Sequence, residues 1–522
     1  MVNYLILLLL ILLAWILALA LLAPFISKSK NFSFFGPALM LKVTKNRKIL
    51  DRFARPVPKE AFSKLSVAIV LVFSLLAVLL LVYEAYLSLF IRIQASTSLG
   101  VYLALPIVNP YIPVVYGTFA LIFAVVIHEV MHGIVSRKHG IKVKSVGALF
   151  FIIPIGAFVE PDQDEINATD PVTRRRIFAA GPAVNLIIAF VIFIMLAGVM
   201  MPSVHPIHDG VYVSGVDGGG IAQTAGIAPG GEVTSLGNFT GSQLYNVGVN
   251  TSIVPGTVVN FTEFNGKSYT RGTIPAGIVF PALLPGYPAQ KANIPAGAIL
   301  YSLDGRTMWN LTTFTNTLDG ILPGTTIPLT VINETYSGGA WTQKFSSYNV
   351  TTVSKYNYYQ QNYPLDNSPS YKHASFIGVS SDYSGFQYVS MPALTQLIFG
   401  DTAFQNFPNG FFEMLALPFI GYSPVPAGVY SLYSTPVAPS MFWVTVNIFY
   451  WVFWLDFLLG LMNALPWFVF DGGQFFKETL AIVSKRRRFS FLTEQRRNAI
   501  SRAIGILVFA LILWEIIVPR VI

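Results

Sequence analysis

Two histidines and a glutamate form a compact motif in the sequence His128-Glu129-Val-Met-His132. On a helix, His128 and His132 are four residues apart, so both imidazoles project from one face and can bind the same tetrahedral Zn²⁺. Glu129 then lies close enough to take a proton from a metal-bound water. The spacing predicts a hydrolytic zinc site with two histidine ligands and a general base.

The motif lies inside an apolar run, at about 113–136, that is long enough to cross a membrane. Ionisable side chains within a membrane segment are costly and mark function by default. A chance match is the alternative, because short motifs carry a false-positive risk. The apolar surroundings of the three ionisable groups favour the metal site and indicate hydrolysis of peptide bonds within the bilayer.

The composition is that of a polytopic membrane protein and not of a soluble enzyme. The chain of 522 residues is 53% hydrophobic and 11% charged, with a mean hydropathy of +0.59. Further apolar runs of spanning length cover about 2–26, 65–91, 177–201, 440–465 and 503–519. With the motif helix they give about six transmembrane helices. The first run is too long for a signal peptide and lacks a basic start, so we expect it to be retained.

A third metal ligand has to be a histidine or a carboxylate, because the chain contains no cysteine. Asp471 follows the fifth span and precedes two glycines, which permit a sharp and closely approaching backbone. His132 lies five residues before the basic Arg137, about 7–8 Å along a helix, and the fifth span also ends just before Asp471. Because both reach a similar depth, we expect His128, His132 and Asp471 to bind one Zn²⁺.

Basic residues predict the orientation, because loops rich in Lys and Arg stay in the cytosol. Such loops occupy residues 28–64, 137–176 and 485–502, whereas residues 205–439 hold only seven of the 34 basic residues. We expect the long region to be extracytoplasmic and the metal site to lie nearer the cytosolic side. The net charge of +9 suits this orientation and contact of the loops with the lipid bilayer. No nucleic-acid-binding module is evident, and loop 28–64 has no further assigned role.

The external region contains an internal repeat, because residues 222–236 recur 67 residues later as 289–303 with matching Ala, Ile, Gly and Leu positions. Each copy has the pattern of a short helix, a Gly turn and a strand. The repeat resembles a tandem pair of PDZ domains, at 205–278 and 279–385, followed by an interfacial connector at 386–439. PDZ domains bind extended chain ends at a sheet edge, so peptide ligands are expected partners. A plug or spacer is the alternative, since neither copy shows the usual Gly-Leu-Gly-Phe loop.

The membrane part, at about 110–202 and 440–480, resembles the site-2 protease family of intramembrane zinc metalloproteases, in the branch with external PDZ domains. The resemblance is carried by the histidine motif, by Gly181-Pro182-Ala-Val-Asn185, and by Asn463-Ala-Leu-Pro466 leading to Asp471-Gly472. It implies that His128, His132 and Asp471 ligate zinc, that Glu129 is general base and then acid, and that Asn463 holds the substrate carbonyl or backbone. Asn185 is a further substrate-binding candidate, with a hydrogen bond between helices as the alternative.

Three other features of the membrane part have structural alternatives. We interpret Gly181-Pro182 as the start of the fourth span. Residues 148–161 match the membrane-embedded hairpin of the family, whose edge is thought to pair with unwound substrate, and a packed loop is the alternative. Asp456 shares a helix face with Asn463, and either tunes the site or gates water, with a neutral, hydrogen-bonded packing residue as the favoured alternative. A straight helix would place it roughly 22 Å from Asp471.

The sequence thus predicts a polytopic α-helical membrane protein with an inserted tandem PDZ-like α+β region. Its membrane parts are residues 1–204 and 440–522. The predicted function is that of an intramembrane zinc metalloprotease that cleaves transmembrane segments of single-span proteins, as in regulated intramembrane proteolysis. One alternative is a membrane-anchored zinc peptidase for soluble external peptides, which the inward placement of His132 and Asp471 argues against. The other is a non-catalytic PDZ-bearing scaffold, which the presence of Glu129 argues against.

Overall fold

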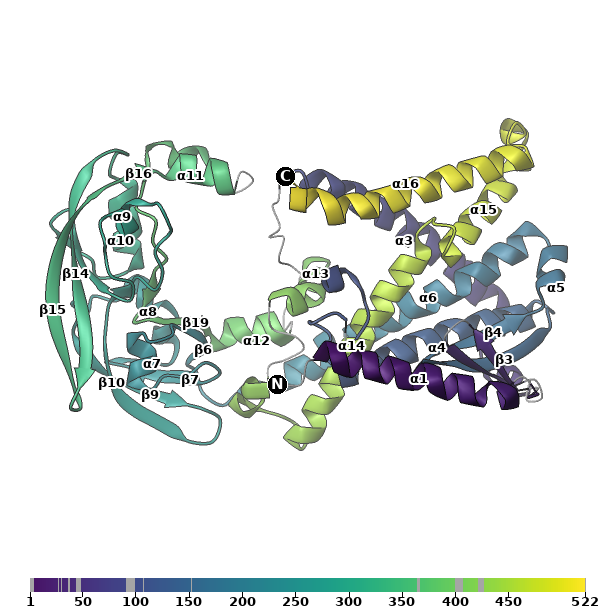
Figure 1. Cartoon of the computed structure of the whole chain (residues 1–522), viewed down its shortest axis with the longest axis horizontal. Helices are drawn as coiled ribbons and strands as arrows, with labels where there is room; N and C mark the ends of the chain where they lie inside the picture. Colours follow the sequence, from purple (N-terminus) through teal and green to yellow (C-terminus); the bar gives the residue numbers. More distant parts are fainter. Residues whose placement is uncertain are drawn as a thin grey trace. The chain divides into compact units, whose positions relative to one another are not determined.

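The chain folds into two compact units. One comprises Met1–Leu196 and Thr445–Ile522, and the other Ala197–Val444. In this computed structural model, long helices dominate the first unit and β-strands the second (Figure 1). The structure describes residues 4–26, 28–29, 31–35, 38–43, 48–90, 99–106, 108–151, 153–363, 367–399, 407–420 and 427–521.

Five of the described helices are long and apolar enough to cross a membrane. They are α3 (Lys59–Leu87), α4 (Val114–Lys138), α6 (Pro171–Met195), α14 (Pro439–Ala464) and α16 (Glu494–Val521). Each coincides with an expected span, so the chain is an integral membrane protein. The sixth expected span coincides with α1 (Tyr4–Ile26). The part of α1 whose side chains are described, Leu13–Ile26, is an apolar helix shorter than a full span.

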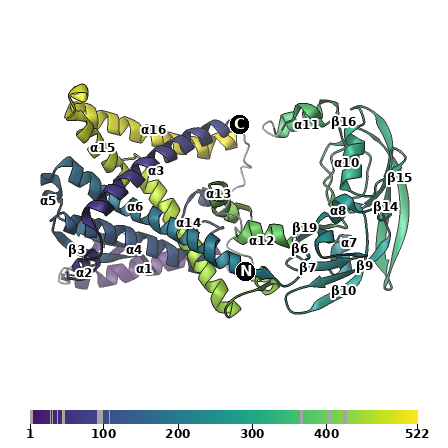
Figure 2. The ribbon, with the colours of Figure 1, turned by 180° about the vertical axis from the view of Figure 1, so that it is seen from behind.

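Helix α6 packs against α3, α4 and α15 (Asp471–Ser484), and so holds together the elements of the helical unit (Figure 2). Asp170 caps its start by accepting hydrogen bonds from the backbone N–H groups of Val172 and Thr173, and Pro171 occupies the first turn. Gly181-Pro182 therefore lies inside the helix. Our interpretation of that pair as the start of the span was wrong, because the Asp-Pro cap begins the helix earlier.

A four-stranded antiparallel sheet accompanies these helices, in the order β1-β2-β3-β4. Strands β3 (Val143–Phe151) and β4 (Ile153–Pro161) form the hairpin expected at 148–161, which confirms the hairpin over the packed loop. Strands β1 (Phe32–Phe35) and β2 (Ala38–Val43) come from the basic loop 28–64, and β2 pairs with β3. That loop therefore has a structural role that the sequence did not reveal.

The repeat of the second unit is visible in its secondary structure. Helix α7 (Ile221–Ala225) and strand β7 (Glu232–Leu236) of the first copy correspond to α9 (Pro288–Lys291) and β12 (Ile299–Leu303) of the second. The aligned apolar residues lie in two hydrophobic cores, one for each copy. The internal repeat is thereby confirmed, whereas the likeness to PDZ domains stays a prediction.

A short hairpin joins the two copies into one sheet. Strand β19 (Phe386–Ser390) pairs with β6 (Val211–Val216) of the first copy, and β18 (Asp382–Tyr383) pairs with β11 (Ile278–Val279) of the second. The order is β10-β9-β7-β6-β19-β18-β11-β12-β14-β15. The expected boundary between residues 385 and 386 falls inside this hairpin, and the strands at the two ends of the sheet are β10 (Tyr269–Pro275) and β15 (Ala340–Thr351).

The remaining elements are mostly short. The helices are α2 (Lys48–Ala54), α5 (Gln163–Ala168), α8 (Val247–Asn250), α10 (Leu311–Asp319), α11 (Lys355–Asn362), α12 (Met391–Phe399) and α13 (Asn409–Ala416). The strands are β5 (His205–Pro206), β8 (Phe239–Thr240), β9 (Val258–Phe264), β13 (Arg306–Thr307), β14 (Thr326–Ser337), β16 (Val353–Ser354), β17 (Ser375–Phe376) and β20 (Tyr433–Ser434).

Candidate metal centre

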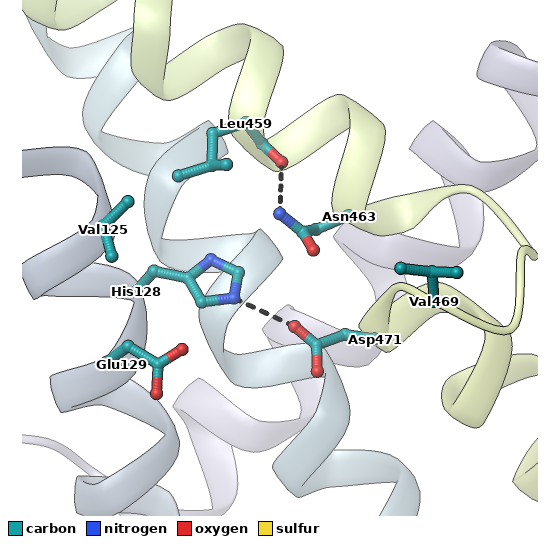
Figure 3. Close-up of a pocket in the computed structure, with 7 residues that line it drawn as sticks. All are labelled: Val125, His128, Glu129, Leu459, Asn463, Val469 and Asp471. Carbon is teal, nitrogen blue, oxygen red and sulfur yellow. Dashed lines mark hydrogen bonds and ion pairs between the residues drawn. The ribbon is translucent and has the colours of Figure 1, made fainter. Parts of the chain in front are cut away.

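The two motif histidines and Asp471 converge at one point in the helical unit. Asp471 Oδ2 lies 2.9 Å from His128 Nε2 and 3.0 Å from His132 Nε2, and the two Nε2 atoms are 3.2 Å apart. Both histidines are buried, with 6% and 8% of their surface exposed. Figure 3 shows the His128 ring and the Asp471 carboxylate facing each other. The structure thus brings together the three residues that the sequence proposed as ligands.

A sharp turn of the chain delivers Asp471 to the histidines. Helix α14 ends at Ala464, and Asp471 begins α15. A Cβ atom at Gly472 would collide with the carbonyl oxygen of Leu465, and one at Gly473 with that of Trp467. The expected close approach of the backbone is therefore present. Helix α14 ends before Asp471, so the straight helix assumed for the separation of Asp456 and Asp471 is not present.

The hydrogen bond on the far side of the His132 ring sets the role of this histidine. Its Nδ1 lies 2.8 Å from the carbonyl oxygen of Ile177, so Nδ1–H donates there and the neutral ring presents the lone pair of Nε2. This lone pair faces His128 Nε2 and the Asp471 carboxylate, and a cation between the three atoms could be bound by all of them. Tetrahedral zinc ligands lie about 3.3 Å from one another, close to the separations observed. The donor set therefore fits a divalent metal such as zinc.

Gly181 of α6 lies directly against the two imidazoles. A Cβ atom at this position would collide with Nε2 of both His128 and His132. Only glycine leaves the space between α6 and α4 that the metal-facing nitrogen atoms need. Sequence reasoning missed this role, and the available signal was a glycine within an apolar helical run.

Glu129 contacts the free edge of the four-stranded sheet. The backbone N–H of Val159, on β4, donates to Glu129 Oε2 at 3.3 Å. Gly133 allows this approach, because a Cβ there would stand 2.6 Å from Val159 Cγ1. The proposed general base is therefore held beside the metal ligands and next to an edge strand.

A pocket of about 250 Å³ opens beside these groups. It is lined by Val125, His128, Glu129, Leu459, Asn463, Val469 and Asp471 (Figure 3). The Asn463 amide donates from Nδ2 to the carbonyl oxygen of Leu459 at 3.0 Å, and this bond fixes the amide on the pocket wall. Asn463 is thus placed to meet a ligand next to the metal ligands.

Asn185 and Asp456 do not line this pocket. Both are fully buried, and their side-chain oxygen atoms and the Asn185 nitrogen have no hydrogen-bond partner among the described residues. Asn185 lies one helical turn beyond Gly181 on α6. A role for Asn185 in substrate binding stays a prediction, because its side chain does not reach the pocket in this conformation.

A buried ion pair ties the helix that carries Asp471 to α6. Arg174 Nη2 lies 2.9 Å from Glu478 Oε2, with 21% and 9% of the two side chains exposed. Arg174 also donates to the carbonyl oxygen of Thr169 at 2.7 Å. Glu478 lies seven residues after Asp471 on α15, close to two turns, so the pair fixes the helix on the face that carries the ligand. Sequence reasoning assigned neither residue a role at the site.

The fold and this site define an integral membrane protein with a histidine–carboxylate centre of the metal-binding type. The family model for peptidase family M50 matches residues 116–511, which include the motif helix, the hairpin, the external region and Asp471. The chain therefore belongs to peptidase family M50, the site-2 protease family. The resemblance seen in the sequence is thereby confirmed.

A curated relative is an uncharacterized protein of Methanocaldococcus jannaschii. It is 48% identical to this chain over 82 residues, which are 16% of this chain and 21% of that protein. The match thus spans about a fifth of the length of the relative.

Proposed function

We propose that this protein is an intramembrane zinc metalloprotease that cleaves transmembrane segments of single-span membrane proteins. One observation carries the proposal: the metal-facing atoms of His128, His132 and Asp471 converge at a pocket that also contains Glu129, in a unit of membrane-length helices. Membership of the M50 family supports it.

The proposed chemistry assigns each pocket residue one task. His128, His132 and Asp471 would hold zinc, which would act there as a Lewis acid and lower the pKa of a water. The carboxylate of Glu129 accepts a proton from the attacking water and returns it to the amine of the leaving chain. The amide of Asn463 holds the backbone of the substrate at the pocket wall.

The edge of β4 is the proposed binding place of the substrate backbone. A helical segment hides its carbonyl groups in internal hydrogen bonds, so the substrate has to unwind before it reaches the centre. An extended chain can then pair with an unpaired strand edge. Strand β4 is the outer strand of its sheet, and its Val159 amide already faces Glu129. This placement supports substrate pairing next to the general base.

We further propose the orientation that the basic loops indicate, with the repeats extracytoplasmic and the metal centre nearer the cytosol. The repeats are proposed to select substrates or their external tails. Because β19 and β18 already pair with β6 and β11, a peptide would add at the outer strands β10 or β15.

Cleavage of a single-span reporter tests the proposal. Full-length protein in liposomes is given a reporter with helix-destabilising residues in its span, and in parallel a soluble peptide with the external sequence of the reporter. We expect mass spectrometry to place the cut inside the span, and we expect chelation to stop cleavage and zinc to restore it. Cleavage confined to the external sequence or to the soluble peptide would instead establish the external peptidase.

A further inference from the structure

A second pocket of the helical unit lies between α15 and α16 and has a volume of about 210 Å³. Its polar lining consists of Gln474, Lys477, Asn498, Ser501 and Arg502. The first two are three residues apart on α15, and the others are three and four residues apart on α16, so each set shares one helix face. Two helices therefore present complementary polar faces to one cavity.

A hydrogen bond between the helices fixes their register around the pocket. The Arg497 guanidinium on α16 donates to Ser484 Oγ at the end of α15, at 3.1 Å, and to the carbonyl oxygen of Leu492 at 3.1 Å. Arg497 thus joins α15 and α16 beyond the pocket. The polar groups that line the pocket are separate from this hydrogen bond and can bind a ligand.

The pocket carries two positive charges and no carboxylate. In the described part of the chain, Lys477 and Arg502 form no ion pair. The neighbouring Glu478 is buried and engaged by Arg174. The ammonium, the guanidinium, two amide groups and a hydroxyl together offer hydrogen-bond donors to a single anion. Phosphate oxygen atoms are the acceptors that such a set suits best.

The surface next to the pocket is apolar. Arg502 is the last charged residue of α16 before twelve uncharged residues that end at Trp514, and Ile506 and Leu507 in that stretch are exposed. Phe468, on the rim of the pocket, is 61% exposed. Basic side chains at the boundary of an apolar helix surface lie at the level of lipid headgroups. A phosphate group bound in this pocket would therefore lie where the acyl chains of a lipid can pack along the apolar face of α16.

We propose that this pocket binds the phosphate headgroup of an anionic phospholipid, with Lys477 and Arg502 as its charged contacts and the exposed apolar face of α16 along its acyl chains. The pocket also contains Gly473, two residues after Asp471. A headgroup that bridges α15 and α16 braces the turn that positions the metal ligand. The binding does not depend on the proposed protease function and is measured without it.

Lipid retention by the full-length protein tests this site. The protein is purified in mild detergent, stripped of lipid, supplied with phosphatidylglycerol or with zwitterionic phosphatidylcholine, and analysed by native mass spectrometry. We expect wild type to retain phosphatidylglycerol in preference to phosphatidylcholine. The double variant Lys477→Gln/Arg502→Gln should retain it about tenfold more weakly, because two charged contacts are lost.

The matched control is Arg487→Gln/Arg488→Gln, which removes the same charge from the turn before α16 without touching the pocket. It should retain phosphatidylglycerol as wild type does. Equal retention by all three proteins, or an equal loss in both double variants, would overturn the proposal. Should the double variant not fold, as judged by zinc content and monodispersity, Lys477→Gln alone replaces it, because Lys477 is exposed, and wild-type retention would again overturn the site.

Inorganic phosphate distinguishes the two sources of the anion. The lipid-free protein is titrated with millimolar inorganic phosphate by calorimetry. Weak binding that phosphatidylglycerol prevents supports a headgroup site. Tight binding of inorganic phosphate, together with no preference for phosphatidylglycerol, would assign the pocket to free phosphate and contradict the lipid proposal.

Discussion

Gly181 determines how closely α6 approaches the metal-facing nitrogen atoms of His128 and His132. The candidate ligands would supply the charge and the lone pairs, but the space for a cation depends on the absence of a side chain on the neighbouring helix. Protein interiors adjust only slightly to an added atom, so a methyl group here has to displace the imidazoles or the helix.

We predict that Gly181→Ala leaves the protein folded but lowers its zinc content and its cleavage rate at least about tenfold, because the Cβ collides with both Nε2 atoms. Metal analysis of the purified variant measures this. Gly505→Ala is the control, since a Cβ there would lie 3.3 Å from a ring carbon of Phe468 and should leave zinc bound. Full zinc occupancy in Gly181→Ala would remove the assigned role.

At the residue level, His128 and His132 could be proposed as ligands because their spacing is local, whereas Asp471 was proposed from its position after the fifth span and from the family resemblance. His128, Glu129 and His132 lie within about one helical turn, and the glycines after Asp471 predict a close backbone approach. The clearance at Gly181 was not predictable, because it depends on which helix packs against the motif. The contact of Glu129 with Val159 likewise arises only when β4 lies against α4.

The elements that position Asp471 are joined by the pair of Arg174 and Glu478. Helix α15 is short, and α6 is the long helix on which it packs. Removal of one partner from a buried ion pair leaves an uncompensated charge, which is costly. The pair therefore fixes both the position of α15 along α6 and the face that α15 turns toward it.

We predict that Glu478→Gln lowers the free energy of unfolding by about 3 kcal/mol, at the lower end for buried pairs because Arg174 is partly exposed, and weakens zinc binding. Thermal unfolding and zinc titration in detergent measure the two effects. Glu60→Gln, which removes the exposed carboxylate that pairs with Arg176, on the same helix as Arg174, is the control and should lower the stability less and leave zinc binding unchanged. A Glu478→Gln protein that loses stability but binds zinc as wild type does would contradict the positioning role.

Among the elements, the spans could be predicted, because apolar length is a feature of a continuous segment. The β3–β4 hairpin was expected from the family resemblance, because the residues alone fit a packed loop equally well. The partnership of β2 with β3 could not be predicted, since it joins segments about a hundred residues apart. Asp170-Pro171 is the pattern that starts α6, and the later Gly181-Pro182 resembles a helix start but lies inside the helix.

For the whole molecule, the repeat was predictable from its 67-residue spacing, but the joining of its copies was not. Strands β18 and β19 are short and follow the first copy by more than a hundred residues.

The first copy contains buried acidic residues, Glu232 and Glu263. Burial raises the pKa of Glu232 to about 7, against the lowering effect of the Gly210 N–H, which donates to its Oε1 at 2.8 Å.

We predict that the first repeat is less stable at pH 8 than at pH 5. The pKa of Glu232 is about 7 in the folded state against 4.5 as the ordinary value, so its contribution is full below about pH 4.5 and is lost as pH rises through 7. Glu232→Gln should remove a pH-dependent difference on the order of 3 kcal/mol. Hydrogen exchange of residues 211–236 in the full-length protein, corrected for intrinsic rates, measures it.

The exposed Asp304→Asn is the control for this change and should keep the pH dependence of wild type. Other carboxyl groups of the region also have raised pKa values through burial, among them Glu334 at about 7, so the difference between variant and wild type is the quantity to compare. An unchanged pH dependence in Glu232→Gln would show that these other groups govern the effect.

We propose that Glu129 acts as the base at a zinc centre formed by His128, His132 and Asp471. The most direct measurement takes zinc content and turnover of a single-span reporter from one preparation of wild type and of Glu129→Gln. We predict that the variant binds zinc as wild type does and cleaves about 10²–10⁴-fold more slowly, because an amide cannot accept the proton. Turnover near the wild-type rate by the zinc-loaded variant would contradict the account.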